Sequence, residues 1–351
     1  DKKLSASLYE EGQLKKTLDL TSNYLTLNVF EVEGQVIIMY LDATGCLNKI
    51  TIALNWETFT KQKLFESKFS SKIEWFNYEN KRYLVGQVII AGDEFQSALT
   101  AKNVAGISAF IIRFSNNFEF EDLNVYGGLK TETFKSITAL NNNLFVLGEK
   151  EYLAEGEFGN GGALNKCNMV LAKISLDLEL LDFKIILSSQ NALKVFNFEE
   201  DIVIVGDNVI ASFDEDLYCN YYFESSNINY AFKTKANKLL VLENNSLLLY
   251  NPFTALKEEN IEINRDLSEI IYYTDYENLR LYFSEEETYL KEIEIYHLDN
   301  FDREVIFGLE EDKNEVLGLF KTLKLFESTN NDYFSENVFG EYKSVEKYKS
   351  G

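Results

Sequence analysis

The sequence predicts an all-β fold: a single β-propeller of seven blades, each a sheet of four antiparallel strands. Three observations predict it. Short apolar runs bounded by Asn, Asp and Gly recur along the chain. One strand–turn–strand segment occurs in two similar copies, Phe110–Asp122 and Val170–Asp182. Phe and Tyr, which favour strands, number 27 and 21 among 351 residues. No amphipathic helix of three turns is apparent, so we expect a chain that is nearly all β.

The first recurring unit is an apolar run that ends at a small or acidic residue. Its copies are Val36–Leu41, Tyr83–Gly86, Leu144–Gly148, Ile202–Gly206, Leu239–Leu242, Leu279–Phe283 and Leu323–Phe326. Each copy is a strand-like run, and such runs along the chain are enriched in β-branched or aromatic residues. Seven copies predict seven sheets.

The second recurring unit is a hairpin that follows most of these runs. Its copies are Ile50–Phe65, Phe110–Val125, Val170–Ile185, Leu247–Ile263 and Glu292–Phe307. Each joins an apolar strand to a more polar one across turn-forming residues. An inner strand such as Thr133–Leu140 completes a sheet of four.

The spacing of these units, roughly 40 to 60 residues, is typical of propeller blades. A four-stranded sheet cannot bury both faces alone, so neighbouring sheets must stack. No linker divides the chain, and we therefore expect one domain over residues 1–351. Six blades is the alternative, because the unit around Leu217–Phe223 lacks a clear second hairpin strand.

Closure of the propeller is expected to use both chain ends. The last unit, Lys321–Phe339, is short of strands, while Ser5–Tyr9 and Leu14–Asp19 are strand-like segments that precede the first unit. We expect residues 1–20 to complete the C-terminal blade and so protect its sheet edges.

Several strand ends resemble degenerate kelch-type propeller repeats. Gly86, Gly148 and Gly206 each end an apolar run, and Leu248–Thr254 carries a Tyr, an amide residue and then Pro. In place of the kelch glycine pair the chain has Gly-Gln, Gly-Glu and Gly-Asp, and the late Trp is missing. The resemblance implies architecture and no particular activity.

The net charge of −23 opposes nucleic-acid binding and adsorption to an anionic membrane, and it favours a basic partner. No run of 18 apolar residues is present, so no transmembrane helix is expected. Cys46, Cys167 and Cys219 lack metal-binding spacing, and we expect either unreactive thiols or one disulfide.

Catalytic chemistry has little support in the sequence. His297 is the single histidine, which excludes Ser-His-Asp, Cys-His and multi-histidine metal sites. No phosphate-binding glycine motif precedes a helix, so we expect no cofactor. A loose calcium site is the exception that the acidic residues Asp207, Asp214, Glu215 and Asp216 allow. Paired carboxylates keep a glycan hydrolase open as an alternative.

Three connections are enlarged at what we expect to be the same end of neighbouring blades: Gly92–Gly106, Glu149–Asn168 and Asp207–Asp216. Exposed aromatic side chains within an acidic rim suit a basic protein partner or a stacked sugar. The predicted partner-binding residues are Asp93, Glu94, Phe95, Glu151, Tyr152, Glu155, Glu157, Phe158, Phe213 and Asp214.

The N-terminal residues Asp1–Leu4 resemble the start of mature Bacteroidetes lipoproteins. Together these features predict a non-enzymatic interaction scaffold, exported to a bacterial envelope or surface, which docks on a partner from a membrane or secretion complex. The alternatives are a carbohydrate-binding module or carboxylate-based glycan hydrolase, and a cytoplasmic adaptor of kelch type.

Overall fold

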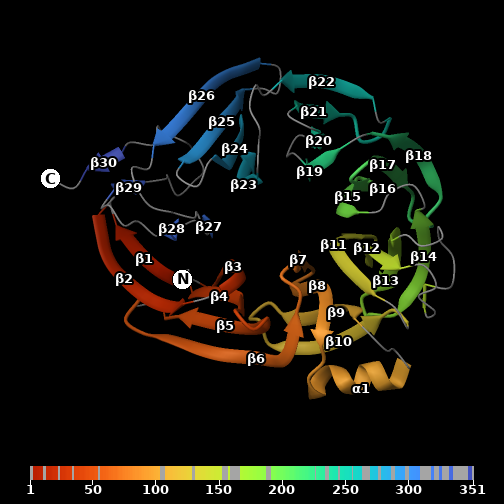
Figure 1. Cartoon of the computed structure of the whole chain (residues 1–351), viewed down its shortest axis with the longest axis horizontal. Coiled ribbons are helices and arrows are strands. Elements are labelled where there is room, and N and C mark those ends of the chain that lie inside the picture. The colour runs from red at the N-terminus through yellow and green to blue at the C-terminus, as the bar shows by residue number, and fades with distance from the viewer. Residues whose placement is uncertain are drawn as a thin grey trace. The chain divides into compact units, whose positions relative to one another are not determined.

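The computed structural model of this chain describes the following residues: 3–10, 13–22, 24–33, 35–53, 56–102, 107–128, 131–151, 157–158, 167–186, 191–225, 227–233, 237–243, 246–254, 256–262, 269–275, 278–285, 289–296, 300–308, 318–319, 324–325, 332–334 and 347–349. The chain divides into two compact units. Unit 1 comprises Asp1–Ala43, Asn48–Gln62 and Asn264–Gly351, and unit 2 comprises Thr44–Leu47 and Lys63–Ile263. Figure 1 labels their elements.

The described elements are strands that pair antiparallel, together with one helix. Those of unit 1 are β1 (Lys3–Glu10), β2 (Gln13–Ser22), β3 (Tyr24–Val32), β4 (Gln35–Asp42), β23 (Glu269–Asp275), β24 (Asn278–Glu285), β25 (Tyr289–Tyr296), β26 (Asn300–Gly308), β27 (Gly318–Leu319), β28 (Lys324–Leu325), β29 (Asp332–Phe334) and β30 (Lys347–Lys349). Strands β5 (Cys46–Ile52) and β6 (Phe59–Phe69) contribute residues to both units.

Unit 2 likewise consists of antiparallel strands, and it contains the helix α1. They are β7 (Glu74–Tyr78), β8 (Lys81–Ile90), α1 (Asp93–Lys102), β9 (Ser108–Ser115), β10 (Phe120–Tyr126), β11 (Glu132–Leu140), β12 (Asn143–Glu151), β13 (Cys167–Ser175), β14 (Leu180–Ile186), β15 (Ala192–Phe198), β16 (Asp201–Gly206), β17 (Val209–Phe213), β18 (Cys219–Glu224), β19 (Ile228–Lys233), β20 (Leu239–Glu243), β21 (Ser246–Tyr250) and β22 (Lys257–Glu262).

In unit 1 the N-terminal strands pair with a strand from near the C-terminus. The sheet order is β2-β1-β28-β27, and Ser7 of β1 is the partner of Lys324 of β28. Strands β23 to β26 form a separate four-stranded sheet in chain order. Apolar side chains from β1 to β5, among them Ala6, Leu20 and Ile38, form one buried cluster.

In unit 2 three successive sheets contain four strands in chain order: β11 to β14, β15 to β18, and β19 to β22. The sheet that precedes them orders β10-β9-β8. Beside β8, the end of β6 pairs through Lys68 and Phe69, and β7 pairs through Glu74–Tyr78. The predicted all-β class and four-stranded antiparallel sheets are confirmed.

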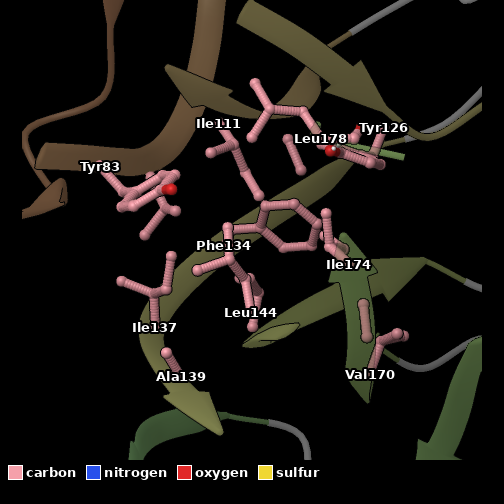
Figure 2. Close-up of a cluster of buried hydrophobic side chains, with 14 of the residues drawn as sticks. Tyr83, Ile111, Tyr126, Phe134, Ile137, Ala139, Leu144, Val170, Ile174 and Leu178 are labelled. Carbon is pink, nitrogen blue, oxygen red and sulfur yellow. Dashed lines mark hydrogen bonds between the residues drawn. The ribbon is translucent and has the colours of Figure 1, made fainter. Parts of the chain in front are cut away.

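These sheets pack face to face because their central strands are apolar on both faces. In β12, Leu144 and Val146 join the cluster shared with the β8–β10 sheet, while Phe145 and Leu147 join the cluster shared with the β15–β18 sheet. Side chains alternate across a strand with period two, so a continuous apolar run serves two neighbours. Figure 2 shows the first of these clusters around Phe134.

The repeated strand–turn–strand segment encodes a repeated turn. In the turn Ser115–Glu119, the Ser115 N–H donates to the Glu119 carbonyl at 2.9 Å and the Ser115 hydroxyl accepts from the Glu119 N–H at 3.1 Å. The turn Ser175–Glu179 repeats both bonds, at 2.9 and 3.0 Å. The fourth residue of each turn has a positive φ and is buried: Phe118 (58°) and Leu178 (62°). The similar sequences therefore specify one local structure.

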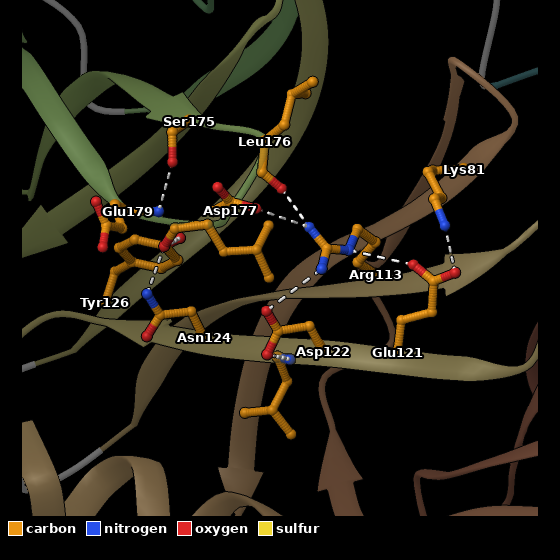
Figure 3. Close-up of polar contacts among 12 residues, drawn as sticks. Lys81, Arg113, Glu121, Asp122, Asn124, Tyr126, Ser175, Leu176, Asp177 and Glu179 are labelled. Carbon is orange, nitrogen blue, oxygen red and sulfur yellow. Dashed lines mark hydrogen bonds and ion pairs between the residues drawn. The ribbon is translucent and has the colours of Figure 1, made fainter.

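The Ser175–Glu179 turn also offers carbonyl groups to the preceding sheet, as Figure 3 shows. Arg113 of β9 donates to the Leu176 carbonyl and lies 3.3 Å from Glu121. The buried Tyr126 hydroxyl donates to the Leu178 carbonyl at 2.7 Å. Polar bonds thus fix the register between adjacent sheets that the apolar clusters hold together.

Gly148 shows why glycine ends one of the apolar runs. A Cβ atom there would lie 2.2 Å from the Thr133 carbonyl oxygen and 2.8 Å from the Phe134 ring. The register of β11 shifts at this point, between Phe134 and Ser136. Glycine is required because a β-bulge brings the two backbones close together.

The structure corrects two boundaries that the sequence suggested. The segment Gly92–Gly106, expected to be a loop, contains α1. The segment Asp207–Asp216, expected to be an enlarged connection, contains strand β17, so that the β16–β17 connection is the turn at Asp207 and Asn208. The fourth strand sought around Leu217–Phe223 is β18, so the reason given for six blades does not hold.

Candidate interaction surface

The two enlarged connections of unit 2 emerge at one end of neighbouring sheets, called here the connection end. The β8–β9 connection is joined to β11 by the Glu132 N–H, which donates to the Ile107 carbonyl at 3.1 Å. The Glu151 N–H donates to the Thr131 carbonyl at 3.1 Å, which places the β12–β13 connection beside it. For these two connections the expected proximity holds.

Helix α1 begins directly after Gly92, whose carbonyl accepts from the Phe95 and Gln96 N–H groups at 3.1 and 3.0 Å. Asp93 and Glu94 lie in its first turn, where negative charge is favourable beside the free N–H groups. One turn apart, Phe95 and Leu99 are its buried apolar residues. The helix is therefore attached to the sheet by a narrow apolar stripe.

Glu94 anchors the helix. Its Oε1 atom accepts from the Ser67 N–H at 3.1 Å and from the Ser67 hydroxyl at 2.9 Å, and the Gly92 N–H donates to the same hydroxyl at 2.8 Å. Hydrogen bonds to a carboxylate are among the stronger ones in proteins. Glu94, predicted as a rim residue, thus fixes α1 to β6.

Phe95 adds an apolar contact to this anchor. Its side chain is 0% exposed, and its ring centroid lies 5.6 to 6.1 Å from those of Phe65, Phe69 and Phe110. The predicted exposure of Phe95 is wrong, because a Phe next to an aromatic core gains more from burial than from solvent. Asp93, by contrast, is exposed.

The β12–β13 connection is described only at Glu157 and Phe158; Tyr152 and Glu155 lie outside the described residues. Phe158 is buried against Phe134 and Phe183, with ring centroids 6.1 and 5.6 Å away, so its predicted exposure is also wrong. Glu151 and Glu157 are partly exposed. Among the residues described here, the two acidic side chains are partly exposed and Phe158 is not, although the Oε2 atom of Glu157 is buried.

A buried acid and a buried base lie beneath this connection, and the sequence analysis did not identify them. Glu132 is 1% exposed and Lys150 is 0% exposed. The Lys150 ammonium donates to the Phe158 carbonyl at 3.1 Å. Burial raises the pKa of Glu132 to about 8 even though the Gly128 N–H and the Lys150 charge pull it down. Burial lowers the pKa of Lys150.

The alternation of side chains was the signal for this pair. Glu132 shares a face of β11 with Phe134, and Lys150 shares a face of β12 with Val146. Both of those apolar residues are buried in the cluster of Figure 2. A period-two reading of the two strands therefore places both charges in the core.

Polar side chains also join the first strands of successive sheets. Ser136 of β11 donates to Glu74 of β7 at 2.9 Å and accepts from the Val195 N–H of β15 at 3.1 Å. Lys194 forms an ion pair with the same Glu74. These contacts satisfy one another and hold β7, β11 and β15 in register.

Phe213 and Asp214 lie away from the connection end. Phe213 is buried at the end of β17, and Asp214 begins the β17–β18 turn, where its Oδ1 atom accepts from the Tyr218 N–H at 2.8 Å. Glu215 in that turn accepts from Asn143 of β12 at 3.1 Å. Asn143 lies at the end of β12 opposite the connection, because it pairs with Ser175 at the close of β13. Phe213 and Asp214 therefore do not join the other predicted residues at the connection end.

The residues considered for a loose calcium site also lie at opposite ends of β17. Asp207 accepts from Asn191 at 2.8 Å at the start of β17, whereas Asp214, Glu215 and Asp216 follow its end. Among the described residues no three acidic, Cys or His side chains are grouped as a metal ion would require. His297 lies outside the described residues. None of the three cysteines forms a disulfide.

No helix in the described part of the chain has the length and apolar content that crossing a bilayer requires. No protein-family model matches the sequence. No curated protein matches it either.

Solved structures do match the fold along most of the chain. BamB from Moraxella catarrhalis matches with a TM-score of 0.54 at 10% identity, covering 96% of this chain and 89% of that one. Apo AztD from Citrobacter koseri matches at 0.55 and 7% identity, covering 99% and 93%. Virginiamycin B lyase from Staphylococcus aureus, selenomethionine-substituted, matches at 0.52 and 11% identity, covering 90% and 91%. All three are β-propeller proteins, and this chain has a β-propeller fold.

Proposed function

We propose that this chain is a non-enzymatic protein-interaction scaffold that docks a partner at its connection end. The observation that carries the proposal is the anchoring of α1. The helix is held by Glu94 and Phe95 on one side and leaves Asp93, Gln96 and Thr100 exposed on the other. A surface held rigid before binding loses less conformational entropy when a partner docks.

The chemistry of the surface suits a basic partner. Asp93 is exposed, Glu151 and Glu157 are partly exposed, and the whole chain carries a net charge of −23. Complementary charge steers association and disfavours partners of the wrong sign. We further propose that the scaffold acts at a bacterial envelope or surface, with its partner in a membrane or secretion complex.

We also propose seven blades, the last completed by β1 and β2 and repeated on a kelch-type pattern. The pairing of Ser7 with Lys324 supports the shared blade. A Ser7→Cys/Lys324→Cys variant is expected to form a disulfide under mild oxidation, since antiparallel partners approach closely enough to bridge. Mass mapping after proteolysis tests this, and a reduced pair under conditions that oxidise free glutathione would count against it.

Charge reversal tests the docking surface. We expect the variant Asp93→Lys/Glu151→Lys to capture at least tenfold less partner from the native cells than the wild-type protein does. The reason is that two attractive charges become repulsive. Quantitative mass spectrometry of affinity-purified, cross-linked material measures the capture. Fractionation of the same cells tests the envelope assignment, which a purely cytosolic chain would contradict.

The matched control is Glu119→Lys/Glu179→Lys, which changes the net charge equally at two exposed turn residues at the opposite end. The control is expected to retain capture. If both variants capture as much partner as the wild-type protein does, the connection end is not the docking surface. Equal loss in both would show that overall charge, rather than this surface, governs binding.

A further inference from the structure

Glu132 and Lys150 are ionisable side chains that are buried in the fold, 1% and 0% exposed. The Glu132 carboxyl faces Gly127, where an added Cβ atom would lie 2.5 Å from Oε2. No described group makes a hydrogen bond of good geometry with either carboxylate oxygen, although the Gly128 N–H is near enough to act on the charge. Such a group is costly when ionised and inexpensive when protonated.

Lys150 connects this carboxyl to the β12–β13 connection. Its ammonium donates to the Phe158 carbonyl at 3.1 Å, and its charge acts on Glu132 across the strand pair, where the two residues are direct partners. Phe158 in turn packs on Phe134, two residues from Glu132. Lys150 therefore ties the Glu157–Phe158 turn to β12, and Glu132 is its cross-strand partner.

The other polar and titratable groups of this region come from β12, β10, the β12–β13 connection and β8. Glu151 of β12 disfavours its ionisation. Tyr126 of β10 is buried, and both Glu157 of the connection and Asp122 of β10 act on it. From β8, the uncharged Gln87 donates to the Glu132 backbone carbonyl at 3.2 Å. Lys150 is the cation that acts on this carboxyl.

We propose that Glu132 and Lys150 form a proton-dependent latch. When the Glu132 carboxyl is protonated, the Lys150 ammonium holds the Glu157–Phe158 turn through the Phe158 carbonyl. When the carboxyl loses its proton to solvent, the buried carboxylate needs a donor and draws the ammonium to itself, since a charged acceptor is stronger than a backbone carbonyl. The turn is then released.

Hydrogen–deuterium exchange between pH 6 and pH 9 tests the latch in the full chain. Wild type and Glu132→Gln are compared at each pH, so that the intrinsic pH dependence of exchange cancels. At pH 6 the peptide with Glu157 and Phe158 is expected to exchange equally in both proteins. At pH 9 it is expected to exchange at least tenfold faster in wild type, at labelling times too short for peptides from β16 to exchange in either protein.

Two further variants keep the test decisive. Lys150→Met is expected to exchange fast in this peptide at every pH, because the donor to Phe158 is gone. Glu151→Gln, which removes the neighbouring charge, is expected to keep the wild-type pH dependence. A wild-type to Glu132→Gln ratio that stays constant from pH 6 to pH 9 would overturn the latch, as would an equal change in all peptides. Should Glu132→Gln not fold, a ¹³C titration of the wild-type Glu132 carboxyl that shows no transition in this range would also overturn it.

Discussion

We expect Phe95→Ala to lower the free energy of unfolding of unit 2 by about 3–5 kcal/mol, the usual cost of removing a buried Phe ring. The ring is fully buried among Phe65, Phe69 and Phe110 and is the larger of the two apolar contacts that attach α1. A helix of ten residues has little stability of its own without tertiary packing. The variant should therefore lose α1 as well as core energy.

Urea unfolding gives the free energy, and hydrogen exchange of the α1 amides reports the helix. The matched control is Gln96→Ala, an exposed position on the same helix, which is expected to change the stability by less than about 0.5 kcal/mol. A loss below 1 kcal/mol in Phe95→Ala, with α1 still protected, would show that Glu94 and Ser67 alone hold the helix.

The strands were predictable because the order of apolar residues in the sequence gives their burial pattern directly. A run such as Leu144–Leu147 is apolar at every position, and each side chain has an apolar neighbour sheet to fill. The turns were predictable for a related reason. The Ser hydroxyl and the apolar fourth residue of Ser175–Glu179 each make a specific contact, so the same letters recur wherever the turn does.

Helix α1 was not predictable from periodicity, because Phe95 and Leu99 are too few to define an apolar face. Its formation depends on tertiary contacts, namely the bonds from Ser67 to Glu94, which lies 27 positions further along the chain. The error at Phe213 has a local cause. A strand of five residues, Val209–Phe213, follows a two-residue turn, and its acidic neighbours gave it the appearance of a loop.

The candidate surface was only partly predictable. The sequence could place acidic residues in two long connections, and the structure brings those connections together through Glu132 and Glu151. Which aromatic side chains face inward depends on neighbouring sheets: Phe158 is covered by Phe134 and Phe183 from two different strands. Connection length alone carries no information about such long-range contacts.

The second large effect is the pH dependence of the unfolding free energy that Glu132 causes. We expect Glu132→Gln to be more stable than wild type at pH 8 by up to about 4 kcal/mol, and equally stable near pH 4.5. Gln reproduces the shape and hydrogen-bonding groups of the protonated carboxyl without its charge. The measurement is the urea unfolding free energy of both proteins at pH 4.5, 6, 7 and 8.

The sign follows from the direction of the pKa change. Burial raises the pKa of Glu132 from 4.5 to about 8 in the folded chain, so the folded state holds a proton that the unfolded state releases. Stability from this group is complete below pH 4.5 and is lost at about 1.4 kcal/mol for each pH unit until about pH 8. Lys150→Met removes the charge that opposes this rise, so the loss should extend to higher pH. A wild-type to Glu132→Gln difference that is independent of pH would mean that the carboxyl is ionised throughout, with Lys150 bound to it rather than to Phe158.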